Sequence, residues 1–232
     1  MNFLVTNDDG YGTNGLKCLI DAAKNFGDVW VVAPAEPQSG ISHQLTRSGT
    51  LKLSKVDECA FTLGGTPVDC SRIGLTQLGI DFDWVLSGVN HGANLGADTF
   101  ISGTLAAARE AVILGKPAIA FSQYRSQFME PNFDWRPARY FTEKLIGQLI
   151  EAEYEHTPLI NVNFPDLCGS DSWEEVTVRE CELDRNPLPL NYEKVGENEF
   201  QYVGKYADRK RTPGRDVDLC LDGSVTITSH SI

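Results

Sequence analysis

The chain has 232 residues, enough for one large hydrophobic core, because domains commonly run to about 100–200 residues. Hydrophobic residues make up 41% and charged residues 22% of the chain, a balance that argues against intrinsic disorder. The net charge of -12 argues against a nucleic acid polymer as partner, since such binding depends on arrays of Lys and Arg. An anionic ligand would need a local device, such as a bound cation or a helix N-terminus.

Nothing in the sequence points to a membrane or to an oxidising compartment. No apolar run approaches the ~20 residues that span a bilayer, and the N-terminus has no signal-like segment. The six cysteines form no CxxC pair, so neither a zinc knuckle nor a dithiol redox motif is available. We expect a cytoplasmic protein with reduced, mostly packed thiols.

Short apolar runs and helical patterns alternate along the first 165 residues. The runs predict buried strands at 3–6, 29–33, 84–87, 118–121 and 159–162, and the patterns predict helices at 16–25, 68–78, 105–114 and 138–151. This alternation predicts an α/β core over residues 1–165, with a Rossmann-like, doubly wound and mostly parallel sheet. Residues 51–63 read as an inserted antiparallel edge. Ligands should bind beyond the carboxyl ends of the strands.

The pattern changes after residue 165. Strand-like segments at 175–183 and 224–228 flank a proline-bearing stretch at 186–190 and a hairpin at 200–206. We interpret residues 166–232 as a C-terminal appendage with a hairpin and a closing strand. Projecting hairpins often pair with another subunit, which favours an oligomer.

The first predicted strand ends in Asn7-Asp8-Asp9-Gly10. Two adjacent carboxylates repel one another and normally require a counter-cation, most simply a hard divalent ion such as Mg²⁺ or Mn²⁺. The same turn carries a second pattern: Gly10, Gly12 and Gly15 match the G-x-G-x-x-G fingerprint of dinucleotide-binding folds, with Glu36 about 20 residues further on. Asp8 and Asp9 disfavour NAD there, because they would face its pyrophosphate.

Three later loops supply further polar groups. The loop after the second strand carries Ser39 and Ser42, whose hydroxyls are candidates for metal or phosphate contact. Residues 86–96 contain three glycines, with Asn90 and Asn94 as neutral amide ligands. Residues 102–104 open an Ala-rich helix with hydroxyls and free N–H groups, which suits a phosphate, although Ser102 or Thr104 also caps the helix.

Charge patterning supports a metal ion. No Lys or Arg occurs from residue 25 to 46 or from 73 to 108, the segments that contain these loops, so we expect the cation to come from solution. His43 and His91 also lie in the candidate loops, as possible acids, bases or supporting groups without an assigned role.

Five ordered motifs resemble the SurE family of survival-protein 5′-nucleotidases. They are Asn7-Asp8-Asp9-Gly10; Val32-Ala33-Pro34 with Gln38-Ser39-Gly40; Gly65-Thr66-Pro67 with Asp69-Cys70; Ser87-Gly88-Val89-Asn90 with Gly92 and Asn94-Leu95-Gly96; and Ser102-Gly103-Thr104. Residues 117–122, 161–165 and 216–229 extend the likeness over nearly the whole chain, while residues 230–232 depart from the family's usual ending.

The resemblance implies a Rossmann-like fold with a C-terminal arm exchanged between subunits, as a homodimer or homotetramer. It implies hydrolysis of nucleoside 5′-monophosphates, and also of 3′-nucleotides or short polyphosphate. It further implies one Mg²⁺ or Mn²⁺ ion per subunit. The implied metal ligands are Asp8, Asp9, Ser39 and Asn90, with Asn94, Ser102, Gly103 and Thr104 near the phosphate and Asp8 and Asp9 as catalytic residues.

The expected mechanism is in-line attack by a water whose pKa the ion lowers, with the helix at residue 102 stabilising the phosphoryl charge. A carboxylate of the Asp pair acting as general base or nucleophile is the alternative. Two rivals from other classes stay open: a phosphorylation-dependent signalling domain, which would lack its acceptor Asp on the next core strand, and an NAD-binding module.

Overall fold

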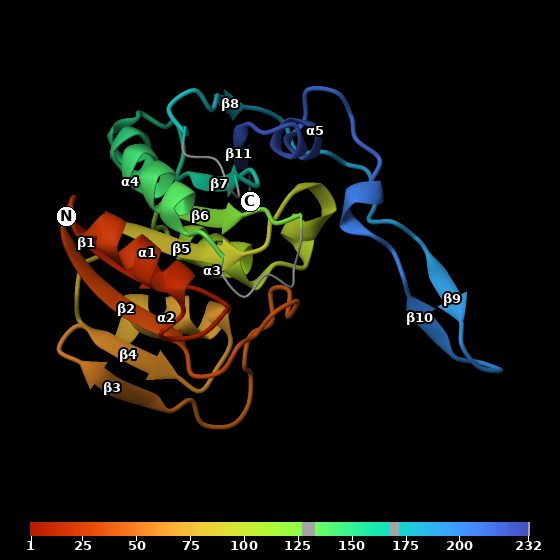
Figure 1. Ribbon diagram of the computed structural model, residues 1–232. Coiled ribbons are helices and arrows are strands. Elements are labelled where there is room, and N and C mark those ends of the chain that lie inside the picture. The colour runs from red at the N-terminus through yellow and green to blue at the C-terminus, as the bar shows by residue number, and fades with distance from the viewer. Residues whose placement is uncertain (127–132, 168–171, 232) are drawn as a thin grey trace.

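The computed structural model describes residues 1–126, 133–167 and 172–231, and its centre is a nine-stranded sheet (Figure 1). The strands run in the order β3-β4-β2-β1-β5-β6-β7-β11-β8. Their bounds are Asn2–Thr6 (β1), Asp28–Pro34 (β2), Leu53–Asp57 (β3), Ala60–Leu63 (β4), Trp84–His91 (β5), Ala118–Gln123 (β6), Leu159–Phe164 (β7), Val178–Glu180 (β8) and Val225–His230 (β11).

The middle of the sheet is parallel. β1 pairs with β2 on one side and β5 on the other, and β5, β6 and β7 continue in the same direction. Only the margins reverse: β3 runs antiparallel to β4, and β11 runs antiparallel to β7. The carboxyl ends of β1, β2, β5 and β6 therefore meet at one edge of the sheet. The predicted antiparallel segment at 51–63 corresponds to β3 and β4.

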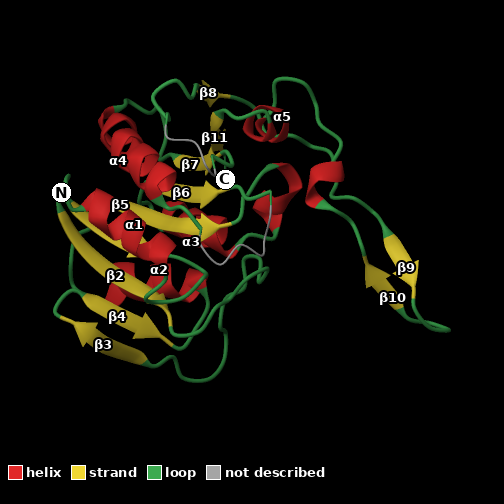
Figure 2. Cartoon of the chain, viewed as in Figure 1, coloured by secondary structure: helices red, strands yellow, loops and turns green. Residues whose placement is uncertain are grey.

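Helices cover both faces of the sheet (Figure 2). α1 (Asn14–Ala23) and α4 (Arg136–Glu151) pack on one face, where Leu19 and Phe141 join the larger hydrophobic cluster. α2 (Pro67–Gln77) and α3 (Gly103–Ile113) pack on the other, where Cys70 and Leu105 join the second cluster. The predicted doubly wound α/β class is confirmed, and each predicted core helix lies within three residues of its observed bounds.

The loop between β2 and β3 is tied to the start of α2. Thr66 caps the helix by accepting from Asp69 N at 3.1 Å, and the carboxylate of Asp69 accepts from Thr66 N at 2.9 Å. The same carboxylate accepts from Thr46 N at 3.1 Å and from the Thr46 hydroxyl at 2.6 Å. One buried acid thus completes a capping box and anchors a loop that reaches the candidate site.

The C-terminal part of the chain has two portions. β11, β8 and α5 (Asp216–Leu221) join the main body, while β9 (Tyr192–Lys194) and β10 (Phe200–Tyr202) form an antiparallel hairpin that projects from it (Figure 1). The hairpin predicted at 200–206 overlaps only β10, the second strand of the observed hairpin. The division of the chain at residue 165 stays a prediction.

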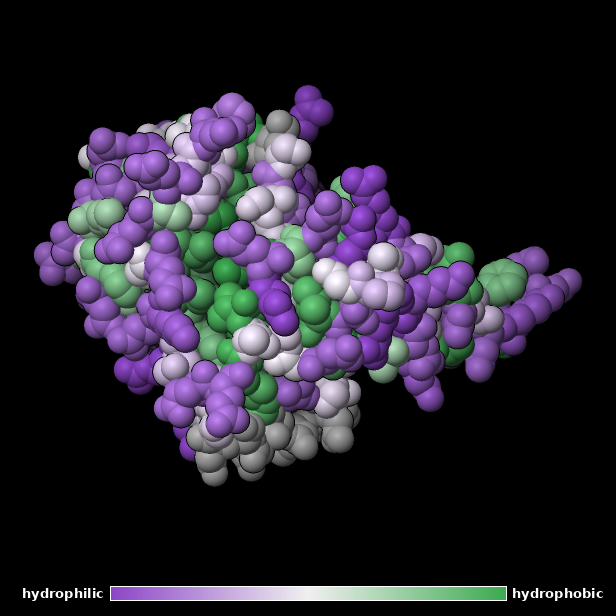
Figure 3. Space-filling model, turned by 90° about the horizontal axis from the view of Figure 1, so that it is seen from above, coloured by the Kyte–Doolittle hydropathy of each residue, from purple (hydrophilic) through white to green (hydrophobic). Residues whose placement is uncertain are grey.

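The hairpin and its flanking loops form an arm, residues 186–215, that carries exposed hydrophobic side chains among hydrophilic ones (Figure 3). Tyr192 is 61% and Phe200 is 66% exposed, and Tyr192 packs edge-to-face against Tyr202 at 5.3 Å between ring centroids. Exposed aromatic surface of this kind is typical of interaction sites.

Two further expectations concern the whole chain. Over the described ranges, no helix combines the length and apolar character needed to cross a membrane. Free thiols are found at Cys18, Cys59, Cys70, Cys181 and Cys220, as expected of reduced cysteines, while Cys168 lies outside the described residues.

Candidate functional site

The turn after β1 is closed by the fully buried side chain of Asn7. Its amide nitrogen donates to Gly10 O at 2.9 Å, and its amide oxygen accepts from Gly10 N at 3.2 Å. This local turn fixes the two residues enclosed by it, Asp8 and Asp9, at the carboxyl end of β1. The sheet therefore presents two neighbouring carboxylates at the edge where doubly wound folds bind ligands.

Asp8 lies directly below the N-terminus of α3. The Thr104 hydroxyl donates to Asp8 Oδ1 at 2.5 Å, and only 4% of Asp8 is exposed. A Cβ atom at Gly103 would lie 2.8 Å from Asp8 Cβ, so the close approach of helix and carboxylate requires glycine. Burial, and then the neighbouring charge of Asp9, raise the pKa of Asp8 to about 7. A cation beside this pair would restore both carboxylates to their charged forms.

Asp9 is more accessible and is held from β5. Its Oδ2 accepts from the backbone N–H of His91 at 3.1 Å. Burial raises the pKa of Asp9, and the His91 N–H partly offsets that rise. Among the described residues, neither Asp8 nor Asp9 forms an ion pair with Lys or Arg.

A cavity of about 260 Å³ opens above these carboxylates. Six of the eight predicted site residues line it, namely Asp8, Asp9, Ser39, Asn90, Asn94 and Ser102. The other two, Gly103 and Thr104, lie behind Asp8 rather than in the cavity wall. A larger open groove of about 1490 Å³ lies elsewhere, along β7 and β11, and contains none of the eight. The chemistry of the polar groups, not the size of the hollow, identifies the candidate site.

Ser39 reaches the cavity on the loop that follows β2. Backbone hydrogen bonds hold this loop at two points: Gln38 N donates to Asp8 O at 2.7 Å, and Ser42 N donates to Ile101 O at 3.0 Å. The loop thus bridges the turn after β1 and the segment before α3. Ser39 is exposed, and it lines the same cavity as both carboxylates.

Asn90 lies near the end of β5, beyond an irregularity in the pairing of β5 with β6. Its side-chain nitrogen donates to Gly92 O at 2.8 Å, an orientation that leaves its side-chain oxygen to act as a ligand. The candidate donors are two carboxylates, a hydroxyl and an amide oxygen. This all-oxygen set fits a hard cation such as Mg²⁺ or Mn²⁺. Within the part of the chain that the structure describes, no cluster of three or more His, Cys, Asp or Glu offers a zinc-like alternative.

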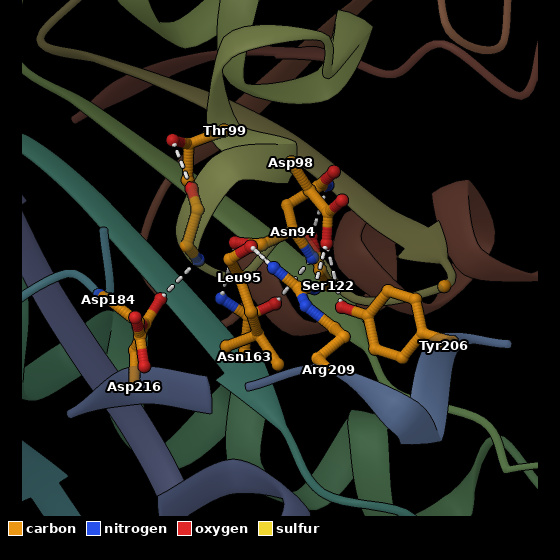
Figure 4. Close-up of polar contacts among 12 residues, drawn as sticks. Asn94, Leu95, Asp98, Thr99, Ser122, Asn163, Asp184, Tyr206, Arg209 and Asp216 are labelled. Atoms are coloured by element: carbon orange, nitrogen blue, oxygen red, sulfur yellow. Dashed lines mark hydrogen bonds and ion pairs between the residues drawn. The ribbon is translucent and has the colours of Figure 1, made fainter. Parts of the chain in front are cut away.

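Asn94 is fixed by a layer of buried polar side chains beneath it (Figure 4). Its backbone N–H donates to Asn163 Oδ1 at 2.7 Å, and its side-chain nitrogen donates to Ser122 Oγ at 2.8 Å. The side-chain nitrogens of Asn161 and Asn163 both donate to Asn94 O, at 2.9 and 3.1 Å. Sequence reasoning did not single out Ser122, Asn161 or Asn163, although polar residues within the buried β6 and β7 runs were a usable signal.

Ser102 is the N-cap of α3. Its Oγ accepts from Leu105 N at 3.0 Å, as expected of a cap, while its hydroxyl proton is available to a ligand. The residue therefore combines a structural role with a place in the cavity wall.

The structure adds a fixed positive charge that the charge count missed. Arg125, just beyond β6, lines the cavity with only 5% of its surface exposed, and its guanidinium lies 4.2 Å above the Phe133 ring. The segments at 25–46 and 73–108 do lack Lys and Arg, but the neighbouring strand brings Arg125 into the same crevice. Arg125 thus gives the crevice a positive charge of the protein's own, and a divalent cation from solution stays a prediction.

The two loop histidines have different surroundings. His91 lines the cavity, and burial, followed by nearby Arg125, lowers its pKa. His43 lies outside the cavity wall, where its Nε2 contacts Glu110 Oε2 at 2.8 Å. Glu110 is buried and also pairs with Arg72.

The glycine fingerprint of the first turn has a packing explanation. A Cβ atom at Gly15 would lie 2.0 Å from Val89 O, so this glycine permits α1 to pack against β5 without any dinucleotide. The signalling-domain alternative gains no support either, because β5, which neighbours β1, ends in Asn90 and His91 rather than an acceptor carboxylate.

The chain is similar to known proteins over nearly its whole length. The family model for survival protein SurE matches residues 3–186. A putative 5′-nucleotidase of Nostoc sp. is 41% identical over 230 residues, covering 98% of both chains. The 5′-nucleotidase SurE of Myxococcus xanthus is 43% identical, covering 97% of this chain and 85% of its own. The crystal structure of the SurE protein from Aquifex aeolicus superposes with a TM-score of 0.87 at 30% identity, covering 99% of this chain and 93% of that one. The chain therefore belongs to the SurE family of survival proteins.

Proposed function

We propose that this protein is a 5′-nucleotidase that hydrolyses nucleoside 5′-monophosphates to the nucleoside and inorganic phosphate. Relatives at 35–44% identity carry the name 5′-nucleotidase SurE. The observation that carries the proposal is one cavity in which Asp8 and Asp9 face a set of neutral oxygen donors beside the N-terminus of α3. Such a site suits an anionic ester held with a counter-cation.

One divalent ion per subunit, Mg²⁺ or Mn²⁺, would be held by Asp8, Asp9, Ser39 and Asn90. When bound, such an ion supplies Lewis-acid stabilisation of phosphoryl oxygens and lowers the pKa of water. The fit is supported by the oxygen-only donor set and by the raised pKa of both carboxylates, whose burial together favours a nearby cation.

The protein's own groups would bind and orient the phosphate. The Ser102 hydroxyl and the Asn94 side chain line the cavity, and the Arg125 guanidinium offers charge-assisted hydrogen bonds to phosphoryl oxygens. Thr104 and Gly103 support Asp8: one donates to the carboxylate, and the other lets the helix approach it.

Asp8 and Asp9 are the proposed catalytic residues. Once a cation has restored the charge of the pair, one of its carboxylates can act as a general base and accept a proton from an attacking water. The alternative, in which a carboxylate attacks phosphorus, would pass through a phospho-enzyme. Single-turnover hydrolysis in ¹⁸O-water distinguishes the two, because direct attack places the label in the released phosphate at once.

Substrate range and assembly belong to the same proposal. The family likeness extends it to 3′-nucleotides and short polyphosphate as further substrates. The exposed aromatic residues of the arm suit pairing between copies, as a homodimer or homotetramer. The net charge of -12 opposes nucleic acid polymers as partners.

The decisive experiment measures phosphate released from AMP and GMP in the presence of Mn²⁺. We expect turnover that EDTA abolishes and that Asp8→Asn lowers by about 1,000-fold or more, as expected when a catalytic group that acts as part of a unit is removed. Asp81→Asn is the matched control, since Asp81 is exposed and pairs with Lys116 before β5, far from the site in the fold. EDTA-resistant turnover retained by Asp8→Asn defeats the mechanism, and NADH binding detected by fluorescence would favour the dinucleotide rival.

A further inference from the structure

The root of the arm lies against the segment that leads into α3 (Figure 4). This segment is the short helix η1, Gly96–Phe100, and the root contains η2, Tyr206–Asp208, followed by Arg209. Arg209 Nη1 lies 2.6 Å from Asp98 Oδ2, and Arg209 Nη2 donates to Leu95 O at 2.9 Å. The guanidinium therefore binds both the Asp98 side chain of η1 and the backbone carbonyl of Leu95, the residue before η1.

Three further contacts support this arrangement. The Tyr206 hydroxyl donates to Asp98 Oδ2 at 2.8 Å, and the Arg209 guanidinium lies 4.7 Å above the Tyr206 ring. From α5, Asp216 Oδ2 accepts from Gly96 N at 2.7 Å. Three residues from the C-terminal part of the chain thus hold one turn of helix.

The held segment connects directly to the phosphate-binding groups. Asp98 O accepts from Ser102 N at 3.0 Å. Asp98, which Arg209 binds through its side chain, therefore also sets the position of Ser102, the N-cap of α3. At the other end, Leu95 follows Asn94, whose backbone and side chain are already fixed from β6 and β7. A shift of η1 would therefore move Ser102 relative to Asn94 and the carboxylates.

Stability alone is a weak reason for this arrangement. A buried ion pair is often no more stabilising than hydrophobic residues of the same volume, because both charges lose their hydration. The Arg209 side chain is 1% exposed, and its Nε–H finds no acceptor among the described residues. The guanidinium does supply two directional contacts, one to the Asp98 carboxylate and one to Leu95 O, which an apolar side chain could not make.

We propose that Arg209 is a positioning residue of the site, acting from the root of the arm through Asp98 and Leu95 to hold Ser102 in phosphate-binding geometry. The proposal rests on the function proposed above, and it links the arm to the cavity within one subunit. Tyr206, which lines the cavity with Tyr124 and stacks on it at 5.6 Å, assists by orienting Asp98.

The test compares Arg209→Met, Arg209→Lys and Tyr206→Phe with the wild-type protein. We expect Arg209→Met to lower kcat for AMP by about 100-fold, the loss that follows a displacement of about 1 Å. The binding of inorganic phosphate, measured by calorimetry with Mn²⁺ present, should weaken in parallel. Mn²⁺ affinity, measured by electron paramagnetic resonance, should stay at the wild-type value, because Arg209 does not hold the proposed metal ligands.

Arg209→Lys should give a smaller loss, since an ammonium can pair with Asp98 but cannot also span to Leu95 O. Tyr206→Phe removes one donor to Asp98 and should lower kcat in the same direction. Arg211→Met is the matched control: Arg211 lies two residues away and pairs with the exposed Asp222 at 3.1 Å, outside the cavity wall, so wild-type kinetics are expected.

Wild-type kcat and phosphate affinity in a folded Arg209→Met protein overturn the proposal. If Arg209→Met does not fold, wild-type values in both Arg209→Lys and Tyr206→Phe overturn it instead. Failure of the wild-type protein to release phosphate from AMP would defeat the proposed function alone, because phosphate binding by calorimetry still tests the role of Arg209.

Discussion

Two groups of carboxylates lie in the wall of one cavity, and their surroundings differ. Asp98 is paired with the buried guanidinium of Arg209 and receives a hydrogen bond from Tyr206. Asp8 and Asp9 have only hydrogen bonds, from the Thr104 hydroxyl and the His91 backbone, and both have a raised pKa. The protein neutralises one group with its own side chain and leaves the other to a ligand. That difference distinguishes Asp98 from the proposed catalytic pair more sharply than burial does.

The largest expected effect concerns the stability of the uncompensated pair. The pKa of Asp8 is about 7 in the folded protein and 3.8 in the reference state, so the folded protein holds that proton more tightly. The free energy of unfolding therefore falls as the pH rises from about 4 to about 7. Asn cannot ionise, so in EDTA at pH 8 Asp8→Asn should be more stable than wild type by as much as about 4 kcal/mol. Urea unfolding at pH 8 and at pH 4 measures this.

At pH 4 the advantage of Asp8→Asn should nearly vanish, because Asp8 is then protonated in the folded wild-type protein. Added Mn²⁺ should stabilise the wild-type protein and not the variant. Equal stability of the two proteins at pH 8 would show that the carboxylate pair is not destabilising, and the contrast with Asp98 would be lost.

Replacing Asp98, the acid that is paired with Arg209, should change the free energy of unfolding in the opposite direction. Asp98→Asn leaves the guanidinium of Arg209 buried without its counter-charge, and we expect the free energy of unfolding to fall by about 3 kcal/mol. Asp222→Asn is the control, since Asp222 pairs with Arg211 at the surface and its side chain is 66% exposed; its effect should stay below about 1 kcal/mol. A stabilising Asp98→Asn would make the two carboxylate groups equivalent.

Substitutions at the tip of the arm should have the smallest effect on Asp98 and on the Asp8–Asp9 pair. Replacing Tyr192 and Phe200 by Ser removes exposed aromatic surface without touching η1 or the cavity. We expect light scattering to show a shift from an oligomer toward the 25.6 kDa monomer, with kcat for AMP unchanged. A wild-type protein that is already monomeric would contradict the proposed assembly. A loss of kcat that follows the loss of assembly would mean that the tip, and not only the root, serves the site.

The sequence predicts the parallel core well because its signals are local. Each buried strand is a short apolar run, and each core helix has its own period and end signals, as Thr66, Pro67 and Asp69 illustrate for α2. Six of the eight predicted site residues line the cavity, since carboxyl ends of parallel strands converge on one edge.

The missed residues depend on long-range contacts instead. Arg209 and Asp98 are 111 positions apart in the sequence, and no local sequence pattern near either residue predicts that they pair. Arg125 follows a strand that was predicted, but its direction depends on how the chain turns after β6. The position of β11 between β7 and β8 is likewise a matter of docking, which an isolated apolar run at 224–228 does not specify.

That position of β11 constrains the order in which the sheet is completed. β8 precedes β11 in the chain, yet within the described structure its only sheet neighbour is β11. β8 therefore has no template to add to until Val225–His230 has aligned against β7. Synthesis from the N-terminus leaves the margin of β7 open while the arm and α5 emerge, and β8 can add to the sheet only after the later strand β11 has paired with β7. Closure of the sheet therefore waits for β11, with the exposed margin of β7 as the surface most open to mispairing in the meantime.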